Sequence, residues 1–267
     1  MKKRIKKVII GVLLVSFLLF LGHNGYDLLK ANQNKREKEK IYQNYDVIKK
    51  LVTDNSTEEA TTNGTVEKTS SEIFTKAKKL VTLSDLRGIV EVSGTNINSF
   101  IMQGSDNSFY LNHLENGEYN ELGSIMLDYR NNLENDTISV IYGHNAYASY
   151  TPFEELEKFY QKDFYEKNRY IYITTSGVRH KYEIFTVAMV PKKTSRHIQI
   201  EFESEQKLDE HLHWLREISL YNTGVEACTS DKVLILQTCS IKYDGNFLII
   251  GGRKVIWWKK LLIISEN

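Results

Sequence analysis

The chain is poor in several residue types and sequence patterns, and each shortage argues against a class of structure or function. Its 267 residues include only two cysteines and two prolines, and the net charge of +1 gives no electrostatic case for binding nucleic acid. Cys and His residues show no spacing typical of zinc. A phosphate-cradling glycine loop is also missing, because Gly251 and Gly252 lie inside a strand-like run. We therefore expect no metal and no cofactor.

The two cysteines, Cys228 and Cys239, allow two interpretations. A disulfide between them would close a short loop and would suit an exported protein. Cys239, however, ends the apolar run 233–238, directly after Gln237 and Thr238. A strand end holds a side chain firmly and still exposes it. We therefore favour a free nucleophile at Cys239 and regard Cys228 as an incidental thiol.

A histidine in a similar setting is available to Cys239. His144 stands in the tetrapeptide Tyr142-Gly-His-Asn145, where a second strand should end. An imidazole beside a thiol favours the thiolate and later protonates a leaving amine, so that acyl transfer proceeds through a thioester. The alternatives are a buried small hydrophobe at Cys239 and a hydrogen-bonded surface side chain at His144, one of 7 histidines.

The N-terminus is typical of a membrane-directed segment. Several lysines and one arginine precede the apolar run 8–22, which is shorter than the roughly 20 residues of a usual span. A cleaved signal peptide is the alternative, but no small-x-small cleavage site follows the run. We favour an uncleaved signal anchor, with a basic cytoplasmic segment at 1–7 and a transmembrane segment at 8–25. The remainder would then lie on the extracellular side of the cell membrane.

The rest of the chain divides by composition. Residues 26–82 are rich in charged and polar side chains and are expected to form a helical stalk and linker, with the charge run as a solvated face. From residue 83 to 260 short alternating strands dominate, interrupted by helical spacing at 153–164 and 204–219. A tail, 261–267, follows. A mostly β fold with helices, closed or partly closed into a barrel, is expected.

Five ordered segments between residues 83 and 255 form a recognisable set: Gly94-Thr-Asn-Ile97, the run from Gln103 to His113, the run from Gly123 to Asn131, Tyr142-Gly-His-Asn145 and Leu236-Gln-Thr-Cys239. Together they resemble the sortase family, especially class B. The resemblance implies an eight-stranded β-barrel with N-terminal helices and a helix, here 204–219, before the strand that carries the catalytic cysteine. It also implies Cys239 as the nucleophile that forms the thioester and His144 as the general acid/base.

The resemblance further implies an activity and its partners. Sortases are membrane-anchored cysteine transpeptidases of Gram-positive bacteria that cleave a C-terminal sorting signal after a threonine. The acyl group passes to an amine of the lipid-linked cell-wall precursor or to a lysine of a pilin subunit. The sequence lacks the aspartate-aromatic lid motif and the second span of the usual pilin-polymerising class. Because some class B members also polymerise pilins, the substrate stays open between a surface protein and a pilin.

One departure from the family concerns an arginine expected at the start of the strand after the cysteine. Asn246 or Phe247 occupies that place, and Arg253 follows six or seven residues later, roughly 20 Å further along an extended strand. Asn246 could donate an uncharged hydrogen bond to the oxyanion, and Arg130 or Arg196 could enter from elsewhere. Two rival functions therefore stay open: an impaired sortase-like assembly or binding protein, and a cysteine hydrolase that releases its acyl group to water.

Overall fold

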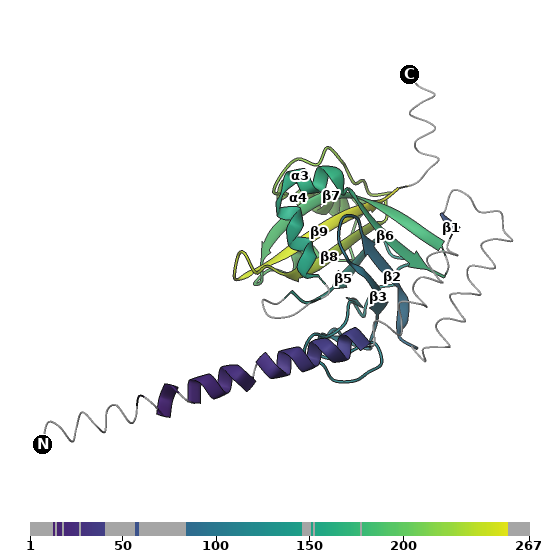
Figure 1. Cartoon of the computed structure of the whole chain (residues 1–267). Coiled ribbons are helices and arrows are strands. Elements are labelled where there is room, and N and C mark those ends of the chain that lie inside the picture. Colours follow the sequence, from purple (N-terminus) through teal and green to yellow (C-terminus); the bar gives the residue numbers. More distant parts are fainter. Residues whose placement is uncertain are drawn as a thin grey trace, which may run out of the picture.

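The computed structural model describes residues 13, 15–17, 19–26, 28–40, 57–58, 84–145, 151, 153–176 and 178–255. Within them, eight strands form the body of the molecule (Figure 1). These are β2 (Leu86–Val92), β3 (Asn98–Met102), β4 (Met126–Leu127), β5 (Ile138–Tyr142), β6 (Tyr170–Thr175), β7 (Val178–Pro191), β8 (Val233–Cys239) and β9 (Asn246–Lys254). The strands expected from the alternating pattern are all present.

The eight strands close on themselves. Their order is β7-β6-β2-β3-β4-β5-β8-β9, and β9 pairs back with β7 along most of its length. The expected eight-stranded barrel is confirmed. A further two-residue strand, β1 (Thr57–Glu58), pairs in parallel with β7, although it belongs to the segment expected to be a linker. Most neighbours are antiparallel, but β5 and β8 run in parallel, so both strands end at the same rim of the barrel.

Alternation along β8 separates two apolar cores. Leu234 and Leu236 face the barrel interior with Leu248 and Ile250 of β9. Their sequence neighbours face outward into a second cluster, which is covered by helix α4 (Glu205–Glu217). The strand is therefore buried on both faces, which explains its continuous apolar run. Only its last residues can reach solvent.

Helix α4 confirms the helix expected at 204–219. The hydroxyl of Ser204 accepts a hydrogen bond from Lys207 N at 3.3 Å and so caps the first turn. Leu212 and Leu215 are buried against the outer face of the sheet. The helix follows β7 and a short 3-10 helix, η3 (Arg196–Ile198), and it precedes β8. It thereby covers the strand that carries Cys239.

The helical stretch expected at 153–164 is present as two short helices. A 3-10 helix, η2 (Glu154–Tyr160), ends at Gln161, whose backbone is extended, and a separate α3 (Lys162–Lys167) follows. Phe153, Leu156 and Phe159 are completely buried and stand three residues apart. A spacing of three aligns side chains on a 3-10 helix, whereas an α-helix would rotate them off one line. The helical spacing of the apolar residues therefore takes the tighter 3-10 form over 154–160.

The N-terminal helical residues 28–40 pack on the loop that joins β3 to β4. Lys38 Nζ donates to Gly123 O at 2.8 Å, and Asn120 Nδ2 donates to Asn34 O at 3.1 Å. Burial lowers the pKa of Lys38 to about 8. In the part of the chain that the structure describes, no helix combines the length and the apolar character that crossing a membrane requires. Segments 1–12, 41–56, 59–83 and 256–267, which include most of the expected linker and the whole expected tail, lie outside the described residues.

Candidate active site at the rim of β5 and β8

The parallel pair β5–β8 brings the two expected reactive residues together. The register matches Tyr142 with Gln237 and continues with Gly143 N donating to Gln237 O at 3.1 Å. His144 and Cys239 each stand two residues further on. Because paired strands lie about 4.8 Å apart, these two residues are neighbours at the rim. Both side chains are half-buried, which suits a reactive pair that must meet a substrate.

Gly143 is required by the close approach of Phe153. A Cβ at Gly143 would lie 2.6 Å from the Phe153 ring, so no side chain fits between the strand end and the first residues of η2. Phe153 N in turn donates to His144 O at 3.1 Å. Thr238 Oγ1 donates to Gly143 O at 2.8 Å from the neighbouring strand. The backbone on either side of His144 is thus fixed by packing and hydrogen bonds.

The imidazole of His144 is oriented by the 3-10 helix η1 (Phe109–Leu111). Its Nε2 lies 2.6 Å from Leu111 O. Because a carbonyl oxygen only accepts, Nε2 carries a proton in this arrangement. Among the described residues, the hydrogen bond of His144 goes to Leu111 and not to the Cys239 thiol. The ring therefore has to turn, or use Nδ1, to reach Cys239; catalytic hydrogen bonds often form only when substrate is bound.

The carbonyl of Cys239 is held by residues to which the sequence analysis gave no role. Asn145 Nδ2 donates to Cys239 O and to Glu157 Oε1, at 3.1 Å each. Glu157 Oε1 also accepts from Ile241 N at 2.7 Å. Glu157 comes from η2 and is invisible to a search for motifs near the cysteine. Asn145, however, adjoins His144, and this position in the tetrapeptide could have indicated it as a site residue.

Phe247 stands directly opposite Cys239 across the antiparallel β8–β9 pair. Directly opposed residues point to the same face of a sheet, so Phe247, one of the two residues at the place where the resemblance implies an arginine, shares the face of Cys239. Asn246 points to the other face at that level. Its Nδ2 donates to Tyr243 O at 3.4 Å and to Asp244 O at 3.2 Å within the 240–245 turn. The assignment of Asn246 as an oxyanion donor stays a prediction. Lys192 Nζ lies 5.9 Å from the centre of the Phe247 ring.

The three arginines considered from the sequence are engaged elsewhere. Arg253 pairs with Val233 at the opposite end of β8, and its Nη2 lies 3.2 Å from Glu183 Oε2. Arg196 stacks over Trp214, with its guanidinium carbon 4.4 Å from the ring centre. Arg130 forms a bidentate pair with Asp128, at 2.9 Å and 2.8 Å. The expected distance between Arg253 and Cys239 is confirmed by the register.

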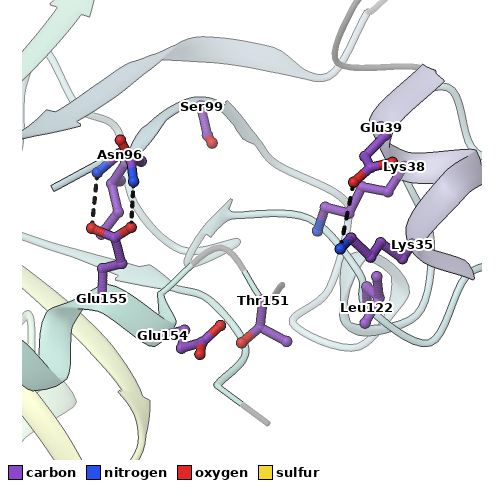
Figure 2. A pocket seen from close by; sticks show the side chains of 10 residues that line it. Lys35, Lys38, Glu39, Asn96, Ser99, Leu122, Thr151, Glu154 and Glu155 are labelled. Carbon is purple, nitrogen blue, oxygen red and sulfur yellow. Dashed lines mark hydrogen bonds and ion pairs between the residues drawn. The ribbon is translucent and has the colours of Figure 1, made fainter. Parts of the chain in front are cut away.

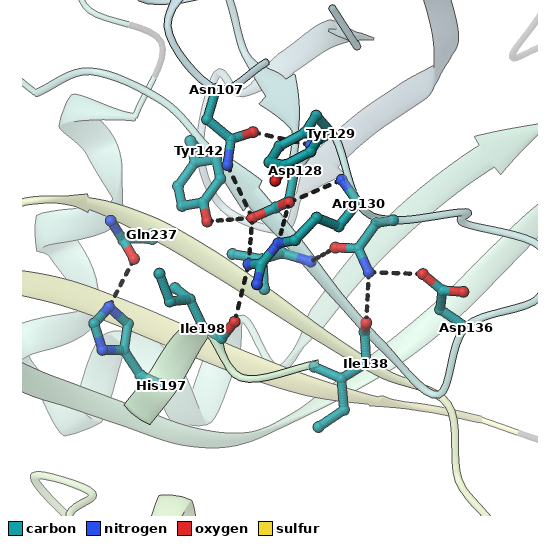
Figure 3. Close-up of polar contacts among 12 residues, drawn as sticks. Asn107, Asp128, Tyr129, Arg130, Asp136, Ile138, Tyr142, His197, Ile198 and Gln237 are labelled. Carbon is teal, nitrogen blue, oxygen red and sulfur yellow. Dashed lines mark hydrogen bonds and ion pairs between the residues drawn. The ribbon is translucent and has the colours of Figure 1, made fainter. Parts of the chain in front are cut away.

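Asp128 is the centre of a polar network below the rim (Figure 3). Its carboxylate is fully buried and accepts from Arg130, from Tyr142 Oη at 2.7 Å and from Asn107 Nδ2 at 3.0 Å. Burial acts to raise the pKa of Asp128, but these hydrogen bonds, led by those of Arg130, outweigh it and hold the pKa at about 2. Arg130 Nη2 also donates to Ile198 O at 3.2 Å. The network therefore joins β4, β5 and the η3 loop.

A second contact joins the η3 loop to β8. His197 Nε2 lies 2.7 Å from Gln237 Oε1, and both side chains are buried (Figure 3). Burial lowers the pKa of His197, while the hydrogen bond to Gln237 acts in the opposite direction. Gln237 stands two residues before Cys239. The η3 loop is thus attached to the strand that ends at the thiol.

The disulfide interpretation is wrong, because both cysteines are free thiols. Cys228 lies outside the rim, and its Sγ is 3.1 Å from Asp231 Oδ2. In the described part of the chain, no group of three or more His, Cys, Asp or Glu side chains is arranged to hold a metal ion.

A separate hollow lies between the N-terminal helix and the barrel (Figure 2). Lys35 and Lys38 line it from the helix, and Glu154 and Glu155 line it from η2. Glu155 is held by Asn96, whose N and Nδ2 donate to its two carboxylate oxygens at 3.0 Å and 2.6 Å. None of the reactive rim residues lines this hollow.

Comparison with known proteins agrees with this geometry. The sequence pattern of the Sortase domain matches residues 90–257. The chain is 30% identical over 161 residues to Sortase B of Staphylococcus aureus, covering 60% of this chain and 65% of the relative, so it spans slightly less than two thirds of that protein. It is 29% identical over 174 residues to Sortase B of Listeria monocytogenes, covering 64% and 70% of the two chains. The solved structure of Clostridium perfringens sortase B is similar with a TM-score of 0.63 and 30% identity, over 67% of this chain and 99% of that one.

Proposed function

Because this chain belongs to the sortase family, of which its relatives are class B members, we propose that it is a membrane-anchored cysteine transpeptidase. The single observation that carries the proposal is the juxtaposition of Cys239 and His144 at the shared rim of the parallel β5–β8 pair. A nucleophile and an acid–base group at adjacent strand ends are what acyl transfer through a thioester requires.

The reaction proceeds in two balanced steps. The Cys239 thiolate attacks the carbonyl carbon of a threonine in the sorting signal, a C–S bond forms, and the C–N bond to the next residue breaks as His144 protonates the leaving amine. An acceptor amine then attacks the thioester, giving its proton to His144, and the thiolate leaves. The acceptor is an amine of the lipid-linked cell-wall precursor or a lysine of a pilin subunit. No step requires a cofactor.

The tetrahedral intermediates carry an oxyanion that needs donors. With Phe247 opposite Cys239, a charged donor from β9 is replaced by a ring, so stabilisation has to come from main-chain N–H groups, from Asn246 after the turn rearranges, or from a nearby ammonium such as Lys192. This arrangement favours a slow enzyme. The two rival functions, a binding module and a hydrolase, are therefore distinguished by the test below.

The N-terminal anchor is part of the proposal. Exposed apolar side chains at Leu13, Val15, Phe17, Leu19, Phe20 and Leu21 follow the basic segment at 1–7 and suit a lipid environment. The catalytic domain would then lie outside the cell, where surface proteins and wall precursors meet. Sucrose-gradient fractionation of cells that express the full chain, followed by protease treatment of intact protoplasts, tests this placement. Retention in the soluble fraction would exclude the anchor.

Transfer is tested with the chain from residue 24 onward, which keeps the helix that packs on the barrel. It is incubated with peptides that carry a fixed threonine and varied neighbouring residues, with and without triglycine as amine acceptor. Mass spectrometry is expected to find an acyl adduct on Cys239 and a peptide–triglycine product. Product that carries water instead of the amine would identify a hydrolase. Peptide binding without any adduct would identify an impaired binding protein.

A further inference from the structure

Gln237 and Cys239 share the outer face of β8. Gln237 is paired with Ile249 and Cys239 with Phe247, and both partners belong to the cluster outside the barrel. Thr238, between them, turns inward opposite Leu248. A strand advances about 3.3 Å per residue, so the side chains of Gln237 and Cys239 leave the backbone roughly 6.6 Å apart. Any peptide bound along this face toward the thiol passes Gln237.

The carboxamide of Gln237 is fixed by a buried imidazole. His197 is 1% exposed, and its Nε2 lies 2.7 Å from Gln237 Oε1. Because a carboxamide oxygen only accepts, Nε2 of His197 is the donor. His197 Nδ1 is buried and has no partner among the described residues. All the hydrogen bonding of this imidazole is therefore directed at Gln237, and the loss of one contact would release the carboxamide.

The other half of the carboxamide is a donor without a partner. In the described part of the chain, Gln237 Nε2 donates to no acceptor. The residue is largely buried but keeps 9% of its surface exposed. Figure 3 shows its nitrogen pointing away from His197. The η3 loop that carries His197 is itself anchored, since Ile198 O accepts from Arg130 at 3.2 Å. The contacts of Arg130 with Ile198 and of His197 with Gln237 thus hold the Gln237 amide in place, and its nitrogen is free to donate to a ligand.

We propose that Gln237 is a specificity-determining donor that binds a carbonyl oxygen of the substrate peptide, and that His197 is the positioning residue that aims it. The inference rests on the proposed function in that Cys239 is taken as the acylation site. An extended peptide advances at the same rate as β8, so the carbonyl that Gln237 reads lies about two residues from the scissile bond. The ligand class is a peptide acceptor group, either a main-chain carbonyl or the side-chain carbonyl of an amide residue.

The test measures kcat and KM for His197→Phe, His197→Gln and Gln237→Glu with the peptides that carry a fixed threonine. His197→Phe keeps the bulk but removes the donor, and it is expected to raise KM about tenfold with kcat within about threefold, as expected for one hydrogen bond. His197→Gln can still donate to Gln237 and should restore most of the affinity. Gln237→Glu replaces the free donor by an acceptor and should bind worst. Peptides with alanine two residues from the scissile bond distinguish a side-chain from a main-chain acceptor.

His211→Phe is the matched control. His211 belongs to α4 and is also buried, 2% exposed, and neither of its ring nitrogens has a partner among the described residues. It should leave KM unchanged. Thermal unfolding of every variant separates misfolding from lost recognition. Wild-type KM in a folded His197→Phe variant, or an equal KM increase in His211→Phe, would overturn the proposal.

A second measurement keeps this inference separate from the proposed function. Cys239→Ala protein, which cannot form a thioester, is titrated with the same peptides after fluorescein labelling, with and without His197→Phe. A tenfold weaker Kd in the double variant supports the positioning role even if the wild-type protein forms no acyl adduct. An unchanged Kd contradicts the positioning role even if acylation is normal.

Discussion

The two ends of the β8–β9 pair share one hydrogen-bonding register but differ in the residues that face each other. At the rim, half-buried Cys239 faces Phe247, and the neighbouring side chains are His144 and a fixed carboxamide. At the other end, Val233 faces Arg253, whose charge is neutralised by Glu183 on β7. Six residues separate the ends, about 20 Å of extended chain. The position of a charge along the register, and not its presence in the strand, therefore decides what chemistry it can support.

The largest expected effect comes from removing the sulfur at the rim. Cys239→Ala should reduce adduct and transfer product below detection, because the other thiol of the sequence, Cys228, lies away from the rim. Cys228→Ala is the matched control, since Cys228 is a free thiol held near Asp231 and away from the rim. Mass spectrometry after incubation with the peptides checks both. Residual adduct in the Cys239 variant would show that another residue is the nucleophile.

Removing the imidazole at the rim should cost less. His144→Ala is expected to lower kcat/KM about 10³-fold, because general acid–base catalysis typically contributes about 10²- to 10⁴-fold. His213→Ala, on the exposed face of α4, is the control and should keep full activity. Stopped-flow assays of peptide cleavage measure both. An activity of His144→Ala within tenfold of wild type would mean that another group, or solvent, protonates the leaving amine.

A charge placed opposite Cys239 tests whether a guanidinium at the rim end of β9 can assist the reaction. Phe247→Arg puts a guanidinium on the same face as the thiol, and we expect kcat to rise about tenfold, less than the roughly 10²- to 10³-fold cost of deleting an adapted oxyanion donor. Phe247→Leu removes the ring without adding charge and separates the two effects. Initial rates with saturating peptide measure the change. If Phe247→Arg is folded and no faster than Phe247→Leu, the oxyanion is already stabilised by other donors.

The sequence predicted the strands and the ends at which the reactive residues stand, because alternation and apolar runs are local properties. It predicted β8 over 233–238, and the strand includes Cys239 as its last residue. Which of Asn246 and Phe247 lies opposite Cys239 could not be predicted, since it depends on register, and the register of a hairpin is set by the geometry of its turn. Gly245, with a positive φ of 79°, closes that turn and places Phe247 opposite Cys239.

The hydrogen bonds that hold the site residues in place were the least predictable from the sequence. Asp128 and Arg130 are two residues apart, yet their partners Tyr142 and Ile198 come from separate elements. His197 and Gln237 are forty residues apart and meet only because the η3 loop folds over the outer face of β8. Such contacts depend on tertiary packing. For the same reason the three-residue spacing in 153–164 could not distinguish an α-helix from η2 before Phe153, Leu156 and Phe159 were seen in one core.

The smallest expected effect lies at the opposite end of the ladder. Arg253→Gln removes a charge that is 3.2 Å from Glu183 Oε2, with side chains 32% and 20% exposed. Because partly exposed ion pairs contribute about 0–1 kcal/mol, the free energy of unfolding should fall by about 1 kcal/mol or less, and kcat/KM should stay at the wild-type value. Urea unfolding and peptide cleavage measure the two quantities, with Glu183→Gln and the double variant completing a cycle. A loss of activity without a loss of stability would show that Arg253 acts on the rim despite the register, and the two ends of β8–β9 would then be coupled.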